Sequence, residues 1–442
     1  MTTRRRLLWG ALASTLLGLP TAAWAVDIKI VTTRLGLKAW LVQDKSAPAL
    51  SVSFSLPGGT ASDPAGQSGV TSLMVGLLTD GAGPLDAQAF RQRLEDAAAS
   101  IGFSASLDRL GGSLRVLAAT RDEGFELLRL ALTQPRFDPD MIEQRRAQTI
   151  AALNQASQRP AALAARTMMA TEFAGYPYAA DPDGTPDDLR KITRQFLEQR
   201  AAALLERSGL VIAVVGDIEE PELARLLDHA FGAMPLGQVP PLLSDWTPPT
   251  RPRTVVVERP VPQSTALLAL PGVRRDDPDW YAVVALNHIL GGGGQQSRLF
   301  TEVREKRGLA YGASSSLRAY RKAGLIVIST ASANERIADA LAVVRSVLAR
   351  LRADGPTEQE LADAKTYLGG ALSLSLDSSP AIAGLLLSMQ VDNLSPDHLT
   401  RRSKLIDAVT LDDVRRLAQR LLNDELLTTI VVGKPAGIVS DP

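Results

Sequence analysis

An internal repeat constrains this chain more than any other feature of its sequence. The segment KITRQFLEQRAAALLERSGLVIAVVGD at 191–217 is matched by AVTLDDVRRLAQRLLNDELLTTIVVGK at 408–434. Three separated pairs keep the same spacing of 217 residues, namely Asp138-Pro139 with Gly355-Pro356, Ile192-Thr193 with Val409-Thr410, and Val214-Val215-Gly216 with Val431-Val432-Gly433. Because this spacing is constant and far longer than a solenoid unit, it indicates a duplicated domain.

The predicted boundary between the two copies is rich in proline. Pro240-Pro241 and Pro248-Pro249 disfavour helix and favour a stiff, extended connector. We therefore expect one lobe over 26–238, a linker over 239–252 and a second lobe over 253–442. Alternating stretches such as LSVSFSL at 50–56 predict sheet strands, and long helical patterns lie between them. The fold class predicted for each lobe is α+β, with helices on a mainly antiparallel sheet.

Residues 1–25 have the pattern of an export signal. Three arginines at 4–6 precede the apolar run LLWGALASTLLGL, and Ala23-Trp24-Ala25 resembles a cleavage site. A membrane anchor is the alternative, but the run is short for a span. No later stretch approaches 18 uninterrupted apolar residues, so we expect no membrane span in the mature chain. We expect a periplasmic location, reached by the Sec or the twin-arginine route.

Composition excludes several classes of function. Lysine plus arginine and aspartate plus glutamate each number 48, so the formal net charge is zero and no global charge favours nucleic acid. The chain contains no cysteine, which removes disulfides, thiolate nucleophiles and cysteine metal sites together.

The segment GGGGQQSRLFTEVREKRGLAY at 291–311 is the most informative motif. Its glycines permit close approach of another chain, and a short helix is predicted after them, with Ser297 as N-cap and Gly308 at its end. Tyr311 is predicted to open the next strand. Arg304 and Tyr311 would then send a guanidinium and a phenol hydroxyl to one spot, two donors suited to a carbonyl oxygen that gains charge.

Composition alone favours a plainer interpretation of this pair. Arg304 is then a solvated helix charge and Tyr311 a half-buried strand aromatic. A phosphate loop is a further alternative for the glycines, but the Lys-Ser/Thr pair that such a loop requires does not follow them.

The 291–311 motif resembles the second-half motif of the insulinase/pitrilysin-type zinc peptidases, a family that includes the mitochondrial processing peptidase. The resemblance covers essentially the whole mature chain and implies two homologous lobes that close like a clam around a chamber. It implies that Arg304 and Tyr311 form the substrate-carbonyl pair. It also implies that the strand at 50–56 offers an edge to an extended peptide, with a weaker substrate-binding assignment for Gly291, Gly292, Gly293 and Gly294.

Active members of that family carry an inverted zinc motif, H-x-x-E-H, on the first long helix of the first lobe, and a glutamate ligand on a later helix. SLPGGTASDPAGQSGVTSLMVGLLTDGAG resembles the local frame of that motif. With Gly69 aligned, the histidine positions hold Ser72 and Gly76, and the general-base position holds Val75. In MIEQRRAQTIAAL the two glutamate positions hold Arg145 and Ala152.

The remaining residues offer no obvious substitute for the zinc ligands. The histidines His229, His288 and His398 lie in separate predicted elements with no i,i+3 or i,i+4 pair, which favours ordinary surface or hydrogen-bonded roles. No G-x-S-x-G or S-x-x-K motif stands in a suitable context, and no carboxylate pair is singled out among the acids. The sequence therefore predicts no cofactor in this chain.

The resulting hypothesis is a metal-free subunit of a periplasmic heteromeric zinc endopeptidase. Its partner would be a homologous zinc-bearing subunit, its substrate a peptide, and Arg304 and Tyr311 would bind the substrate carbonyl across the interface. The alternatives are a catalytically inactive peptide-binding or scaffolding protein of the cell envelope, and a self-sufficient peptidase with an unrecognised site.

Overall fold

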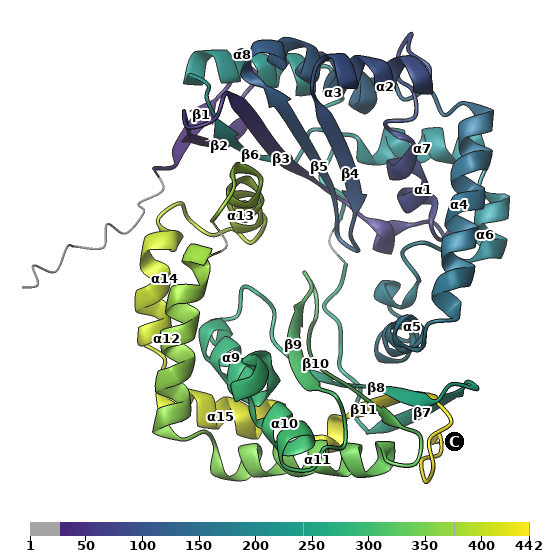
Figure 1. Ribbon diagram of the computed structural model, residues 1–442. Coiled ribbons are helices and arrows are strands. Elements are labelled where there is room, and N and C mark those ends of the chain that lie inside the picture. Colours follow the sequence, from purple (N-terminus) through teal and green to yellow (C-terminus); the bar gives the residue numbers. More distant parts are fainter. Residues whose placement is uncertain (1–26, 242, 375, 442) are drawn as a thin grey trace, which may run out of the picture.

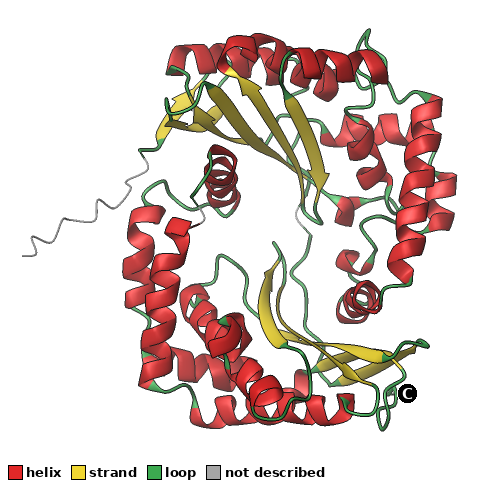
Figure 2. Cartoon of the chain, viewed as in Figure 1, coloured by secondary structure: helices red, strands yellow, loops and turns green. Residues whose placement is uncertain are grey.

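Two β-sheets, one from each half of the sequence, organise the structure, and helices surround them (Figures 1 and 2). The computed structural model describes residues 27–241, 243–374 and 376–441, so the predicted export signal at 1–25 lies outside the described residues. Within those ranges no helix is long and apolar enough to cross a membrane.

The first sheet has the strand order β1-β2-β6-β3-β5-β4, and every pairing is antiparallel except that of β2 with β6. Its strands are β1 (Lys29–Thr32), β2 (Lys38–Gln43), β3 (Ala49–Pro57), β4 (Ser100–Ala105), β5 (Arg109–Leu117) and β6 (Val211–Gly216).

The second sheet, β7-β11-β8-β10-β9, repeats the order of the last five strands of the first, β2-β6-β3-β5-β4, with β7 and β11 as its parallel pair. Its strands are β7 (Arg253–Glu258), β8 (Gln263–Pro271), β9 (Ala313–Ala319), β10 (Gly324–Ala333) and β11 (Thr428–Gly433). Both ends of β11 lie 217 residues beyond those of β6. The predicted fold class, two similar α+β lobes, is therefore confirmed.

The helices repeat in the same way. Thr193 caps the first helix of the repeated segment and Thr410 caps its counterpart, each accepting a backbone N–H through its side chain. In the first half the α-helices are α1 (Val70–Leu77), α2 (Ala87–Asp96), α3 (Arg121–Thr133), α4 (Pro139–Ser157), α5 (Pro160–Glu172), α6 (Pro186–Lys191), α7 (Arg194–Leu204) and α8 (Glu220–Phe231). In the second half they are α9 (Trp280–Asn287), α10 (Arg298–Phe300), α11 (Ile337–Asp354), α12 (Glu358–Leu374), α13 (Ser379–Val391), α14 (His398–Asp407) and α15 (Leu411–Leu421).

Each sheet packs its outer face against helices of its own half. In β3 the alternate residues Leu50, Val52, Phe54 and Leu56 are buried in a core shared with α1, α3 and α8. In the second half, β8 and β10 build the equivalent core with α9, α11 and α15. The period-two pattern of LSVSFSL therefore places its apolar side chains in this core and its serines on the opposite, inner face.

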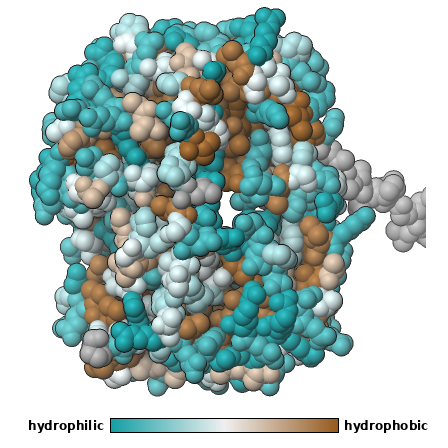
Figure 3. Space-filling model, turned by 180° about the vertical axis from the view of Figure 1, so that it is seen from behind, coloured by the Kyte–Doolittle hydropathy of each residue, from teal (hydrophilic) through white to brown (hydrophobic). Residues whose placement is uncertain are grey.

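The inner faces are covered by an exchange of helices between the halves. Helix α13 of the second half packs on β3 and β6, where Ile382, Leu386 and Met389 meet Ala213 and Val215. Helix α5 of the first half packs on β8 and β11 in the same manner. Figure 1 shows α13 beneath the upper sheet and α5 above the lower one. The halves are thus held together through apolar surface, and an opening remains between them (Figure 3).

The two hairpin tips also meet between the halves. Asp108, in the turn between β4 and β5, accepts hydrogen bonds from the Tyr178 hydroxyl (2.6 Å) and from the backbone N–H of Arg321 (3.2 Å), in the turn between β9 and β10. Beside them, Phe173 is fully buried, and its ring centroid lies 5.0 Å from that of Trp246 in the proline-rich segment and 5.6 Å from that of Tyr320.

One expectation about the first sheet is wrong. The strand at 50–56 was expected to offer a free edge, but β3 pairs with β5 on one side and with β6 on the other. Its hydrogen-bonding groups are therefore already used. The free edge at this end of the sheet belongs to β4, whose one neighbour in the sheet is β5.

Candidate functional site

The glycine-rich segment forms a tight bend that packs against the second sheet. A π-helical turn, η4 (His288–Gly292), leads into the 3-10 turn η5 (Gly294–Gln296). A Cβ atom on Gly291 would lie 2.4 Å from the backbone nitrogen of Ser315 in β9, and one on Gly292 would lie 2.6 Å from Nδ2 of Asn287. A Cβ atom on Gly293 would lie 2.9 Å from the His288 carbonyl oxygen. Internal packing thus explains these three glycines.

Gly294 differs from the other three because nothing lies within 4 Å of the position of its Cβ, and its φ of +61° is in the left-handed region. At this position the backbone conformation, rather than crowding, favours glycine. Contact of Gly291, Gly292, Gly293 or Gly294 with substrate stays a prediction.

The helix that follows has the predicted organisation. It consists of α10 and the π-helical turn η6 (Thr301–Glu305), and it buries Leu299 and Val303 in the second core. Ser297 stands at the N-cap position, although its hydroxyl donates to the Gly294 carbonyl (2.7 Å) and does not cap the helix. Gly308 ends the helix with a φ of +56°.

Arg304 and Tyr311 are brought together across that turn. The guanidinium of Arg304 donates to the backbone carbonyl oxygen of Tyr311, and its Cζ lies 4.1 Å from the centroid of the Tyr311 ring. Tyr311 is 87% exposed and lies two residues before β9, so it does not open that strand as expected. A half-buried guanidinium and a largely exposed phenol, both able to donate hydrogen bonds, therefore lie side by side.

Glu302 anchors the helix that carries Arg304. Its buried carboxylate bonds to Lys306 (2.8 Å) and Arg307 (2.6 Å), and Arg350 of α11 lies 3.2 Å away. Hydrogen bonds from these cations, with that from Lys306 first, lower the pKa of Glu302 to about 2. The carboxylate is thus ionised at neutral pH and ties the motif helix to α11.

The positions that resemble the zinc motif are filled by groups unsuited to a cation. The Ser72 hydroxyl donates to the Pro182 carbonyl (2.8 Å), and Val75 is buried and apolar. Gly76 has no side chain, and the site where its Cβ would stand lies 3.4 Å from Nε of Arg145. Arg145 in turn bonds through Nη2 to Asp80 (2.7 Å).

These contacts decide whether zinc fits the first lobe. Ala152 is exposed on α4 and provides no ligand atom, and Arg145 brings a positive charge against Gly76. A dication placed there would be repelled by the guanidinium and would find no imidazole or carboxylate of the family's motif. The residues of this chain do not fit a catalytic zinc at that position. The sequence identified the substitutions but gave no sign that Arg145 contacts Gly76.

The histidines have ordinary partners. His229 bonds to Glu126 (2.8 Å), and His398 bonds to the Tyr281 hydroxyl (2.7 Å). The His288 ring stacks on Tyr367, with centroids 4.7 Å apart, and burial lowers the pKa of His288. In the part of the chain that the structure describes, no group of three or more acidic or histidine side chains is arranged to hold a metal ion.

A polar strip on the inner face of the first sheet was not predicted from the sequence. Ser53 and Ser55 of β3 lie beside Ser113 and Gly111 of β5, and Ser104 of the edge strand β4 lies beside Gly111. The signal was present as the alternation of serine in LSVSFSL. Without the pairing of the strands, however, nothing showed that the serines form one surface.

The fold and these positions define a class of protein, a two-lobed relative of metallopeptidases whose metal positions are filled by other side chains. The family profile described as Peptidase M16 inactive domain matches residues 191–368. The Peptidase M16 inactive domain from Pseudomonas fluorescens, a solved structure, superposes with a TM-score of 0.87 at 29% identity, covering 94% of this chain and 99% of that one.

Two curated relatives also link this chain to that family. An uncharacterized zinc protease of Mycobacterium leprae is 31% identical over 260 residues, and the match spans 58% of each chain. The non-peptidase homolog YmxG of Helicobacter pylori is 28% identical over 318 residues, which are 71% of this chain and 72% of that protein. Residues 191–368 of this chain thus match the M16 family of peptidases, the insulinase/pitrilysin-type family, and the chain as a whole is similar to inactive members of that family.

Proposed function

We propose that this chain is the metal-free subunit of a periplasmic heteromeric zinc endopeptidase. It supplies Arg304 and Tyr311 to a shared active site, and its partner is a homologous subunit that carries the zinc. The observation that carries the proposal is the contrast between the two halves. In the second half two donors lie together, with Tyr311 largely exposed, whereas in the first half a guanidinium contacts the metal position.

The chemistry of the pair suits a carbonyl oxygen on which negative charge develops. Within the described residues, the Arg304 guanidinium makes one hydrogen bond, to the Tyr311 carbonyl, so most of its five N–H groups are available, and the Tyr311 side chain is largely exposed. Both side chains can therefore donate to a substrate oxygen. Loss of one donor of this kind commonly lowers kcat by about 10²–10³.

The peptide substrate is proposed to lie along β4. Among the described strands β4 pairs with β5 alone, which leaves its outer edge unpaired, whereas β3 is paired on both sides. An added strand makes main-chain hydrogen bonds, which accept many sequences, and the serine-lined inner face beside it suits a polar backbone. This placement replaces the 50–56 edge expected from the resemblance.

The experiment requires the partner. A gene next to that of this chain, encoding a product of similar length with H-x-x-E-H, is the first candidate, and the two chains should be co-expressed with their export signals. Cleavage of a quenched fluorescent peptide is then measured for each chain alone and for the complex. We expect activity from the complex, and a fall in kcat of about 10²–10³ for Arg304→Ala or Tyr311→Phe.

Arg318→Ala is the control, because Arg318 is an exposed cation of β9, the strand that follows the motif, and lies outside the Glu302 cluster. It should keep kcat near that of the unchanged complex. If Arg304→Ala and Tyr311→Phe leave the activity of the complex untouched, the shared site is wrong. The alternative, an inactive peptide-binding or scaffolding protein, then becomes the better description.

A further inference from the structure

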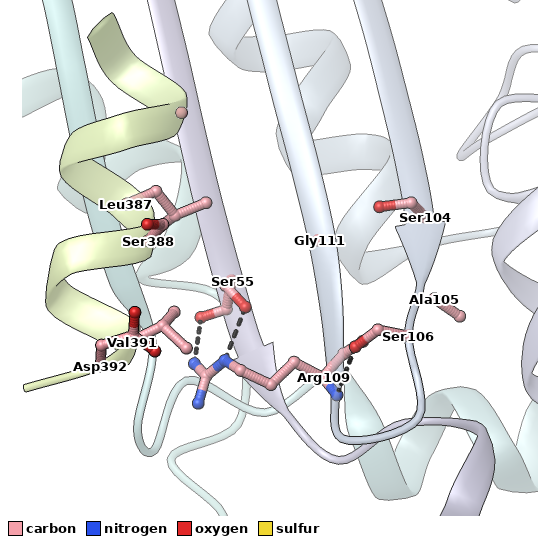
Figure 4. A pocket seen from close by; sticks show the side chains of 11 residues that line it. Ser55, Ser104, Ala105, Ser106, Arg109, Gly111, Leu387, Ser388, Val391 and Asp392 are labelled. Atoms are coloured by element: carbon pink, nitrogen blue, oxygen red, sulfur yellow. Dashed lines mark hydrogen bonds between the residues drawn. The ribbon is translucent and has the colours of Figure 1, made fainter. Parts of the chain in front are cut away.

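A cavity of about 300 Å³ lies between the inner face of the first sheet and α13 (Figure 4). Ser55 and Arg109 line it from β3 and β5, Ser104 from the edge strand β4, and Ser388 and Asp392 from the end of α13. Its walls therefore come from both halves of the chain. It adjoins the strand edge along which a peptide would lie.

Arg109 is the charged group in the wall formed by the sheet. Its Nε donates to the Ser55 hydroxyl (2.7 Å), and its Nη2 donates to the carbonyl oxygens of Ser55 (3.0 Å) and Gly209 (3.2 Å). All of these acceptors are uncharged. Among the described residues no carboxylate lies within 4.0 Å of this guanidinium, and that of the neighbouring Asp108 is bonded to Tyr178 and Arg321.

The surroundings of the Arg109 guanidinium disfavour its positive charge. Burial, together with the nearby positive charge of Arg321, lowers the pKa of Arg109 to about 10, so the group still carries its charge at neutral pH. The negative charge of Asp108 acts in the opposite direction and offsets part of this effect. A partly buried cation with no carboxylate in direct contact is unfavourable, and an incoming anion relieves that cost.

The opposite wall contains one acid, and it already has a partner. Asp392 lies 3.6 Å from Arg275, and burial raises the pKa of the Asp392 carboxyl. Ser104 and Ser388 add hydroxyl groups to the lining. Two glycines keep the space open: a Cβ atom on Gly111 would lie 2.8 Å from the Ser104 hydroxyl oxygen, and a Cβ atom on Gly384 would have nothing within 4 Å.

We propose that this cavity binds a carboxylate group of an extended peptide, with the Arg109 guanidinium as its main partner and the serine hydroxyls as additional donors. The inference deepens the proposed function, because it rests on peptide as the substrate and adds a preference for carboxylate-bearing peptides. A C-terminal carboxylate and an acidic side chain share this chemistry.

Binding to the full chain alone, measured by isothermal titration calorimetry, tests the proposal. The probes are three N-acetylated peptides of one threonine- and valine-rich sequence of about ten residues: one with a free C-terminus, one amidated, and one amidated with a central glutamate. We expect at least one carboxylate peptide to bind about 10- to 100-fold more tightly than the neutral amide, and the peptide that does so identifies the source.

Two variants remove the preference by different routes. Arg109→Gln removes the charge, and Gly384→Leu adds bulk to the cavity from an open position on α13 while Arg109 stays in the chain. Both should bind the three peptides equally, while Arg109→Lys should keep part of the preference. The matched control is Gly370→Ala, a second helical glycine with nothing within 4 Å of its Cβ position, which lies outside the cavity and should behave like the unchanged chain.

Three outcomes would overturn the proposal: equal affinity of all three peptides for the unchanged chain, no binding of either carboxylate peptide, or a preference that survives both Arg109→Gln and Gly384→Leu. The readout needs neither a partner nor cleavage. A carboxylate preference without any reconstituted proteolysis would therefore uphold this site and contradict the proposed function. Reconstituted proteolysis without a carboxylate preference would uphold the proposed function and contradict this site.

Discussion

Replacing Phe173 with alanine should weaken both halves of the molecule at once. Phe173 follows α5, is fully buried, and contacts Tyr178 and Trp246 as well as Tyr320 of the other half. Uncovering a phenylalanine side chain of about 150–200 Å² costs about 4–5 kcal/mol at 25 cal/mol per Å². This agrees with the 3–5 kcal/mol usual for Phe→Ala in a core. We therefore expect the free energy of unfolding to fall by about 3–5 kcal/mol.

Tryptophan fluorescence in urea can follow each half separately. Trp40 lies in β2 and Trp280 begins α9. Two variants, each of which keeps one of these two tryptophans and carries phenylalanine at the other four of the five, report on the two halves. Since each half covers the inner face of the other, both reporters should show one shared transition, and Phe173→Ala should shift both equally.

The control is Leu236→Ala, which removes an apolar side chain that is 64% exposed and should change the stability by less than about 0.5 kcal/mol. If Phe173→Ala shifts the transition of one reporter and leaves the other in place, the halves unfold independently. The inference that the exchanged helices couple them would then be wrong.

Two further predictions concern charges. The double variant Ser72→His with Gly76→His should bind Zn²⁺ at least about 10-fold more tightly when Arg145→Ala is added, because the Arg145 guanidinium repels a dication. Titration of both variants against a competing chelator measures the two affinities. Equal affinities would disprove the repulsion. Glu302 has a folded-state pKa lowered from 4.5 to about 2, so its stabilising contribution is complete above about pH 4.5 and is lost as the pH falls toward 2. Glu302→Gln should thus lower the free energy of unfolding by about 1–2 kcal/mol at pH 7 and by less at pH 3. Urea unfolding measures this loss at both pH values, and an equal loss at the two would contradict the prediction.

The sequence predicted the local elements well because their signals are local. The pattern around Ser68–Thr79 predicted a helix where α1 lies, and the 217-residue spacing predicted the repetition that the two strand orders show. The motif at 291–311 predicted the convergence of Arg304 and Tyr311, since both residues flank one turn. The signal segment, the domain boundaries and the substrate contacts stay predictions.

What the sequence did not predict depends on contacts between distant residues. The strand at 50–56 was taken for an edge because nothing in its own residues shows that β6, which begins at Val211, pairs beside it. The contact of Arg145 with Gly76 likewise joins two helices far apart in the chain. The exchange of α5 and α13 was not predicted either, since an apolar helix pattern does not say which sheet it covers.

The exchanged helices also impose an order on biosynthesis. The strands of the first sheet are all present once Gly216 has been made, yet the helix that covers its inner face begins only at Ser379. During translation, the nascent polypeptide therefore carries a bare, partly apolar surface for more than a hundred residues of further elongation. Holding chaperones have that interval in which to bind it, and a message truncated after the first half encodes a product that is prone to aggregate.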